Sequence, residues 1–164
     1  MSRIRTNEAG FTLIEVLIAL AIITIASVLA APDFVRWNAK VQLRQTTAEI
    51  ASQLTLARMA GMNRNRSVDV TVNMSGGLVR ISAVSSTGTV IKDTSFPTRV
   101  KSVVGNPVGN PVAVSFSSMG TRTSAGTGPQ SIGICDLYGR QYSVTITLSG
   151  KVNWSSSGSG TPCP

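Results

Sequence analysis

A single carboxylate stands in the longest apolar run of this chain. Residues 11–31 are apolar, small or hydroxylated, except for Glu15, which is the only charged side chain among them. A lone acid inside a membrane-length helix costs about 2.5–3.5 kcal/mol on insertion scales, so such a residue commonly has a partner or a function. The chemistry available to it is ionic, because a carboxylate can neutralise one cationic partner in apolar surroundings. Glu15 is therefore the first candidate functional residue.

The apolar run is long enough to cross a membrane. At about 1.5 Å per residue, residues 11–31 span roughly 31 Å. Arg3 and Arg5 precede the run and no comparable basic pair follows it at once, so the amino end is expected in the cytoplasm and the body of the chain outside it. An ordinary secretory signal, cut after Ala31, is the alternative, but its apolar region is typically only about 7–15 residues long. The length of the run and the proline at position 32 favour a retained helix.

The words GFTLIE, at positions 10–15, closely resemble the class III signal of type IV pilins and type II secretion pseudopilins. This resemblance implies cleavage after Gly10 by a prepilin peptidase, N-methylation of the new terminal Phe11, and assembly into a helical filament. It also implies that the Glu15 carboxylate meets the terminal amine of Phe11 on a neighbouring subunit and sets the register. Pilins commonly carry a proline where Pro32 stands, which implies a helix bend or local melting on assembly.

Beyond Pro32 the apolar pattern is first helical and then alternating. A helical face with spacings of three and four is formed by Leu43, Thr47, Ile50, Leu54, Ala57 and Gly61. The helix is expected to end near Asn63, where the word NRNR breaks the pattern. The period then becomes two, and strands are predicted at 68–72, 78–81, 89–92, 99–104, 112–116, 131–135, 140–148 and 151–154.

These elements predict an α+β protein. Residues 1–10 form a basic leader that is removed, 11–31 a transmembrane helix, 32–66 an amphipathic helix continuing from it, and 67–164 an antiparallel β head. The apolar face of the long amino-terminal helix is expected to pack on the antiparallel β-sheet head, as in a pilin, and to share one core with the inward side chains of the strands.

Two late cysteines and no histidine limit the covalent and metal chemistry. Cys135 and Cys163 are predicted to form a disulfide, as is common in exported chains, that ties down a tail rich in serine and glycine. Two distant thiols without histidine offer too few ligands for a metal site. The acids show no catalytic spacing and the serines no nucleophile elbow, so neither an enzyme nor a cofactor is expected.

The later part of the chain resembles the GspH/FimT group of minor pilins and pseudopilins. The resemblance rests on the words LTLAR at 54–58, NRNRSV at 63–68, FSSMG at 116–120 and LSGKV at 148–152. Two short motifs differ in sequence from those typical of the group. MAG stands at 59–61 in place of a more polar S-E-A-like word, and GKVN at 150–153 holds one positive charge where some DNA-uptake members have two, in G-R-x-R.

The chain is basic, with a formal net charge of +8, which permits contact with anionic head groups or phosphate-rich polymers. A stripe of Arg36, Lys40 and Arg44 recurs at four-residue spacing and suits lipid head groups, acidic neighbours in a filament, or plain solvent. The candidate contacts with DNA phosphates are Arg64, Arg66, Arg122, Arg140 and Lys151.

Together the patterns and the resemblance predict a structural minor pilin of a type IV pilus. The alternatives are a GspH-type pseudopilin of a type II secretion system and a FimT-like DNA-binding subunit for natural transformation. The implied partners are the prepilin peptidase, other major and minor pilins or pseudopilins, inner-membrane lipid before assembly and, in the last alternative, DNA. The implied location is the bacterial inner membrane, single-pass with a cytoplasmic amino terminus and a periplasmic head, and then the filament.

Overall fold

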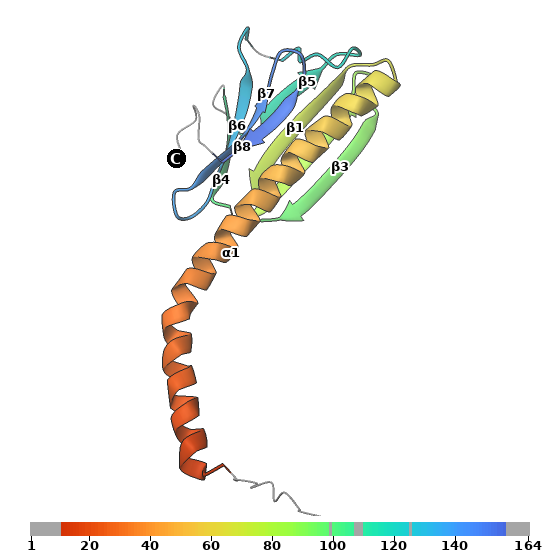
Figure 1. Ribbon diagram of the computed structural model, residues 1–164. Helices are drawn as coiled ribbons and strands as arrows, with labels where there is room; N and C mark the ends of the chain where they lie inside the picture. Colours follow the sequence, from red (N-terminus) through yellow and green to blue (C-terminus); the bar gives the residue numbers. More distant parts are fainter. Residues whose placement is uncertain (1–10, 99, 107–109, 125, 157–164) are drawn as a thin grey trace, which may run out of the picture. The chain divides into compact units, whose positions relative to one another are not determined.

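The computed structural model describes residues 11–98, 100–106, 110–124 and 126–156, and the side chains at 28–32 and 106 lie outside that description. The chain divides into two compact units, Met1–Arg36 and Trp37–Pro164. Helix α1 (Leu13–Asn63) contributes to both units, and all the described strands belong to the second (Figure 1). The predicted leader, residues 1–10, lies outside the described residues.

In the second unit, α1 presents one apolar face to the strands. The six positions predicted to share that face, from Leu43 to Gly61, are all buried, so this prediction is confirmed. Thr47 fits among apolar neighbours because its hydroxyl donates to the carbonyl oxygen of Leu43, 2.8 Å away. That bond satisfies the one polar group that burial would otherwise leave without a partner. The helix ends at Asn63, as predicted.

The strands form two antiparallel sheets. Their bounds are β1 (Val68–Ser75), β2 (Leu78–Ser85), β3 (Val90–Pro97), β4 (Ser102–Asn106), β5 (Val112–Phe116), β6 (Gln130–Cys135), β7 (Gln141–Ile146) and β8 (Val152–Ser155). One sheet has the order β3-β2-β1-β5 and the other β4-β6-β7-β8. Each predicted strand overlaps an observed one, but several bounds differ. The strand predicted at 99–104 begins only at Ser102, and residue 99 lies outside the described residues. Strand β3 extends to Pro97 because it pairs with Leu78–Val84 of β2.

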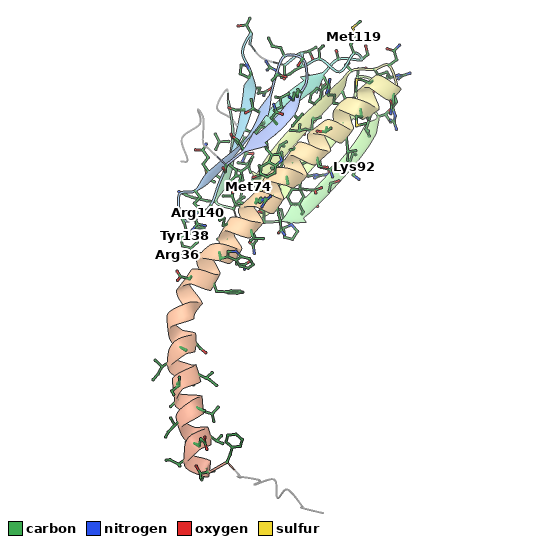
Figure 2. All side chains as sticks on the ribbon, in the orientation of Figure 1. Arg36, Met74, Lys92, Met119, Tyr138 and Arg140 are labelled. Carbon is green, nitrogen blue, oxygen red and sulfur yellow. The ribbon has the colours of Figure 1, made fainter. Side chains whose placement is uncertain are left out.

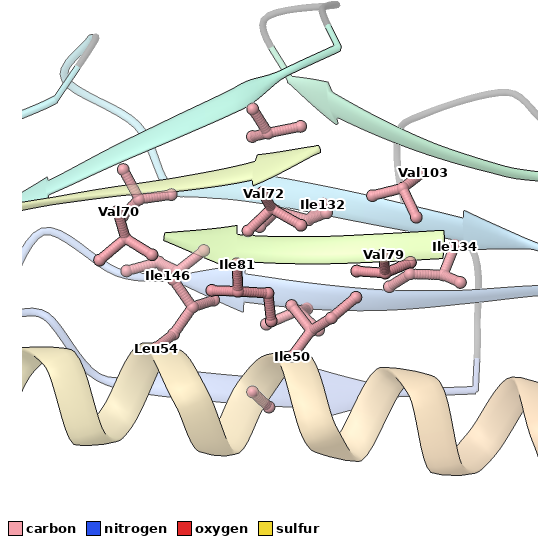
Figure 3. Packing of buried hydrophobic residues seen from close by; sticks show 14 of the residues in the cluster. Ile50, Leu54, Val70, Val72, Val79, Ile81, Val103, Ile132, Ile134 and Ile146 are labelled. Atoms are coloured by element: carbon pink, nitrogen blue, oxygen red, sulfur yellow. The ribbon is translucent and has the colours of Figure 1, made fainter. Parts of the chain in front are cut away.

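One core lies between α1 and the two sheets. Ile50 and Leu54 project from α1 toward Ile81 of β2 and Ile146 of β7 (Figure 3). Phe116 at the end of β5 is also fully buried. Burying a side chain of this size contributes about 1.5–3 kcal/mol, so this helix face fixes α1 against both sheets.

Candidate assembly site and head surface

The amino-terminal turn of α1 is capped by Thr12. Its hydroxyl oxygen accepts a hydrogen bond from the backbone N–H of Glu15, 3.3 Å away, and Glu15 lies in the first helical turn. The spacing T-x-x-E is that of a capping box, in which the first residue satisfies an unpaired backbone donor. The negative charge of Glu15 also suits the positive end of the helix dipole. Thr12 is thus a site residue that the sequence analysis missed, although the spacing of its motif marks it.

Apart from Glu15, the side chains that follow the cap are mostly apolar on every side of the helix, and they are exposed. Phe11 is 83% exposed, and the large apolar residues from Leu13 to Ile25 are exposed with it. The hydroxyls of Thr24 and Ser27 donate to the carbonyl oxygens of Ala21 and Ile23, so they add little polarity to this surface. A helix that is apolar all round is one that becomes buried among other apolar groups.

No helix within the described residues is both long enough and apolar enough to span a membrane. The predicted span at 11–31, the bend at Pro32 and the cleavage after Gly10 therefore stay predictions. Gly10 lies outside the described residues, as does the side chain of Pro32. Cys135 is buried at the end of β6 and is not a free thiol. Cys163 lies outside the described residues, so the predicted disulfide also stays a prediction.

Arg58 joins three segments that are far apart in the sequence. Its Nε donates to the carbonyl oxygen of Gly120 at 2.7 Å, and its Nη2 donates to that of Ser149 at 3.2 Å. Gly150 has a φ of +77°, and a Cβ on it would overlap the Gly120 carbonyl oxygen. The motifs LTLAR, FSSMG and LSGKV therefore lie in contact with one another. We call this contact the Arg58 clamp (Arg58, Gly120, Ser149 and Gly150).

Arg64, Arg66 and Lys151 are exposed and belong to segments close to the clamp. The backbone N–H of Arg66 donates to the carbonyl oxygen of Gly61, 3.0 Å away and about one helical turn beyond Arg58. Lys151 directly follows Gly150 in the clamp. These three cations are the part of the predicted DNA contact set that the structure places at one end of the head.

Arg122 is not a surface contact, so its assignment as a candidate DNA contact is wrong. The residue is 5% exposed. Its Nη1 donates to the carbonyl oxygen of Ser124 at 2.6 Å, and its Nη2 donates to those of Gly126 and Gly128. The guanidinium is used inside the molecule, where it organises the 121–130 loop, because a forked donor can serve several carbonyl oxygens at once.

Arg140 lies at the other end of the head. Its guanidinium is 6.0 Å from the ring centre of Tyr138, in the turn between β6 and β7. Figure 2 shows Arg140 and Tyr138 at one end of the second unit and Met119, beside the clamp, at the opposite end. The predicted DNA contacts therefore do not form a single surface.

Another cation is paired across the first sheet. Arg80 of β2 donates through Nε to Asp93 Oδ1 of β3 at 3.0 Å. This hydrogen bond lowers the pKa of Asp93 below its usual value. Because both side chains are exposed, the pair contributes little to stability, but it offsets the charge of Arg80 on this face.

Comparison with known proteins agrees with this arrangement. A family model described as the type II transport protein GspH matches residues 46–150, and one described as the prokaryotic N-terminal methylation motif matches residues 5–31. A search of curated proteins found no match.

Two crystal structures of the type IV minor pilin FimU from Pseudomonas aeruginosa (strain PAO1) share the fold, each at 15% sequence identity. The P21 form has a TM-score of 0.57 and covers 76% of this chain and 97% of FimU; the P65 form has a TM-score of 0.56 and covers 74% and 99%. Since the GspH model matches more than half of the chain, the chain belongs to the GspH family and is a pilin-like subunit of the minor pilin or pseudopilin type.

Proposed function

We propose that this protein is a minor subunit of a type IV pilus that enters the filament through α1. The observation that carries the proposal is the exposed apolar surface of residues 11–25, which holds one carboxylate, Glu15, in the first helical turn. Apolar helices of neighbouring subunits would cover that surface, and the β head would face outward. The function is structural, and no catalytic step is proposed.

Glu15 sets the register in this proposal. Cleavage after Gly10 would free the amine of Phe11, which the carboxylate of a neighbouring subunit neutralises. In apolar surroundings, a charge without its partner costs about 3–5 kcal/mol, so a misplaced subunit is rejected. The Thr12 cap would hold the first turn, and hence the Glu15 backbone, in helical form before the partner arrives.

The test of this role is Glu15→Val, with Glu15→Gln as the isosteric control. Both variants should reach the membrane at wild-type levels, and both should appear in sheared filaments at least tenfold less, since about 1.4 kcal/mol is a factor of ten. Quantitative immunoblots of membrane and filament fractions measure the two pools. Wild-type incorporation of either variant would contradict a charge-based register.

The same parts would serve a type II secretion pseudopilus. The family model is named for a type II transport protein, whereas the structural match is to a type IV minor pilin. Deletion of the gene in the native host separates the two systems. Loss of pili with normal protein secretion supports the pilus, and the reverse result supports the pseudopilus.

In either system we propose a bacterial inner-membrane anchor, with the amino terminus in the cytoplasm and the head in the periplasm before assembly. The partners would be the prepilin peptidase and other pilins or pseudopilins. The methylation-motif match at residues 5–31 supports processing at this end of the chain.

DNA binding is a second candidate, limited to the clamp end of the head. The exposed cations Arg64, Arg66 and Lys151 favour it, and each phosphate contact lowers the slope of log K against log salt by about 0.9. If all three engage duplex DNA, the slope should be about −3. The triple glutamine variant should bring it near zero, while Arg140→Gln should leave it unchanged. Fluorescence anisotropy at several salt concentrations measures the slope, and no binding at low salt would remove this function.

A further inference from the structure

The end of the head at which α1 enters carries a group of cations and aromatic rings. The Arg44 guanidinium lies 5.8 Å from the ring centre of Trp154 on β8. Trp154 is 40% exposed, and its ring lies 6.2 Å from that of Tyr142. Lys40 is exposed one helical turn before Arg44. We call these side chains, together with Leu137, Tyr138 and Arg140 of the β6–β7 turn, the entry patch.

The β6–β7 turn is built to display its side chains. Asp136 is 2% exposed, and its Oδ1 accepts from the backbone N–H groups of Tyr138 at 2.9 Å and Arg140 at 2.7 Å. Those two bonds hold the turn closed while Leu137 and Tyr138 point outward, 72% and 48% exposed. An aspartate that satisfies its own turn in this way is a common means of fixing a loop. The carboxylate of this turn is therefore buried, and the cation that the turn contributes is the half-buried Arg140.

Such a combination of groups matches the surface of an anionic membrane. Tryptophan and tyrosine concentrate at the level of lipid head groups, because one part of each ring system is apolar and another is polar. Lysine and arginine near an anionic leaflet add a favourable electrostatic contribution, and their aliphatic stems can lie along apolar surface. The patch also adjoins, along the chain, the segment proposed above as the membrane anchor.

We propose that the entry patch docks the head onto anionic lipid head groups while the subunit waits in the membrane. This inference rests on the proposed membrane anchor. It assigns to Trp154, Arg44 and Lys40 a role that ends when the subunit enters the filament. Docking would hold the head down and leave the clamp end facing away from the membrane.

The experiment uses the full chain, in a Trp37→Phe background that leaves Trp154 as the only tryptophan. The protein is reconstituted into vesicles that contain a head-group spin-labelled lipid, with either zwitterionic lipid alone or about 30% phosphatidylglycerol. Flotation reports whether the anchor holds, and quenching of Trp154 reports whether the head touches the surface. Quenching should be stronger in anionic vesicles, and 0.5 M salt should remove most of the difference, because screening shortens the reach of the charges.

Charge variants decide the assignment. Neutralising one cation should lower the ratio of docked to free heads about fivefold, since a cation near an anionic surface contributes about 1 kcal/mol. Lys40→Gln and Lys40→Gln/Arg44→Gln test this. Lys40→Glu, at an exposed helix position that leaves the Trp154 ring contact intact, tests it without disturbing the fluorophore. Arg64→Gln/Arg66→Gln removes equal charge at the opposite end and should leave quenching unchanged.

Three outcomes would overturn the inference. Quenching that is equal in both lipids despite normal flotation would show that the head does not dock. An equal loss in the Arg64→Gln/Arg66→Gln control would show that net charge matters and the patch does not. Binding of duplex DNA through Lys40 and Arg44, with no response of the quenching to lipid charge, would assign the patch to nucleic acid. Failure to float in either lipid would instead contradict the membrane anchor.

Discussion

Gly150→Ala should unfold the head about 10–15 °C below the wild-type midpoint. Gly150 has a φ of +77°, and an alanine Cβ there would overlap the backbone carbonyl oxygen of Gly120. The left-handed conformation costs an L-residue about 1–2 kcal/mol, and forcing two backbone segments apart adds about 1–3 kcal/mol. A loss of about 3–4 kcal/mol in a head of this size corresponds to that shift. Thermal unfolding followed by circular dichroism measures it.

Gly139→Ala is the matched control. Gly139 has nearly the same φ, +76°, but nothing lies within 4 Å of the position that its Cβ would take. The control should therefore lose only the conformational part, about 1–2 kcal/mol. If the two variants unfold at the same temperature, the close approach of Gly150 to Gly120 does not contribute to the stability of the head, and the backbone there can move apart to admit a Cβ.

Arg122→Met should destabilise the head by about 2–3 kcal/mol. Its guanidinium donates to the carbonyl oxygens of Ser124, Gly126 and Gly128 from a buried position. Methionine fills similar space but leaves those oxygens without their donor, and a hydrogen bond from a charged group contributes about 1.5–3 kcal/mol. Urea unfolding gives the change in free energy. Hydrogen exchange should show lost protection between residues 121 and 130.

Arg64→Met is the control for charge and side-chain length, because Arg64 is exposed. Its unfolding free energy should stay within about 0.5 kcal/mol of the wild type. Arg122→Lys should be almost as destabilising as Arg122→Met, since one ammonium cannot reproduce the forked geometry. A wild-type free energy for Arg122→Met would mean that the loop satisfies its carbonyl oxygens without the arginine.

The parts of the fold that depend on local periodicity could be predicted. The buried face of α1 from Leu43 to Gly61 follows a 3.6-residue period, and the alternation from Val68 onward follows a period of two. Each pattern arises because one side of an element is removed from water. The end of α1 at Asn63 was also predictable, because the polar segment that follows has no apolar side chains with which to continue the buried helix face.

Contacts between distant segments could not be predicted in this way. Nothing around Arg58 indicates that it reaches Gly120 and Ser149, since those acceptors are backbone carbonyl oxygens, which every residue has. The prediction that Arg122 contacts DNA was wrong for the same reason, because its acceptors are also backbone carbonyl oxygens. A basic residue in a polar, glycine-rich loop suggests a surface contact, and its burial depends on how the loop closes around it. The predicted cation set therefore separated into a buried residue, one at the entry end and three near the clamp.

The Arg58 clamp has a consequence for the order in which the head folds. Its two hydrogen bonds join residues 62 and 91 positions apart, and closing such long loops costs entropy before any contact is gained. The tip of α1 therefore cannot be secured until the β7–β8 hairpin, which comes late in the chain, has formed. Until then the apolar face of α1 is exposed and can bind other apolar surfaces. If the head folds in the periplasm, as proposed above, a holding chaperone there would have its greatest effect in this interval.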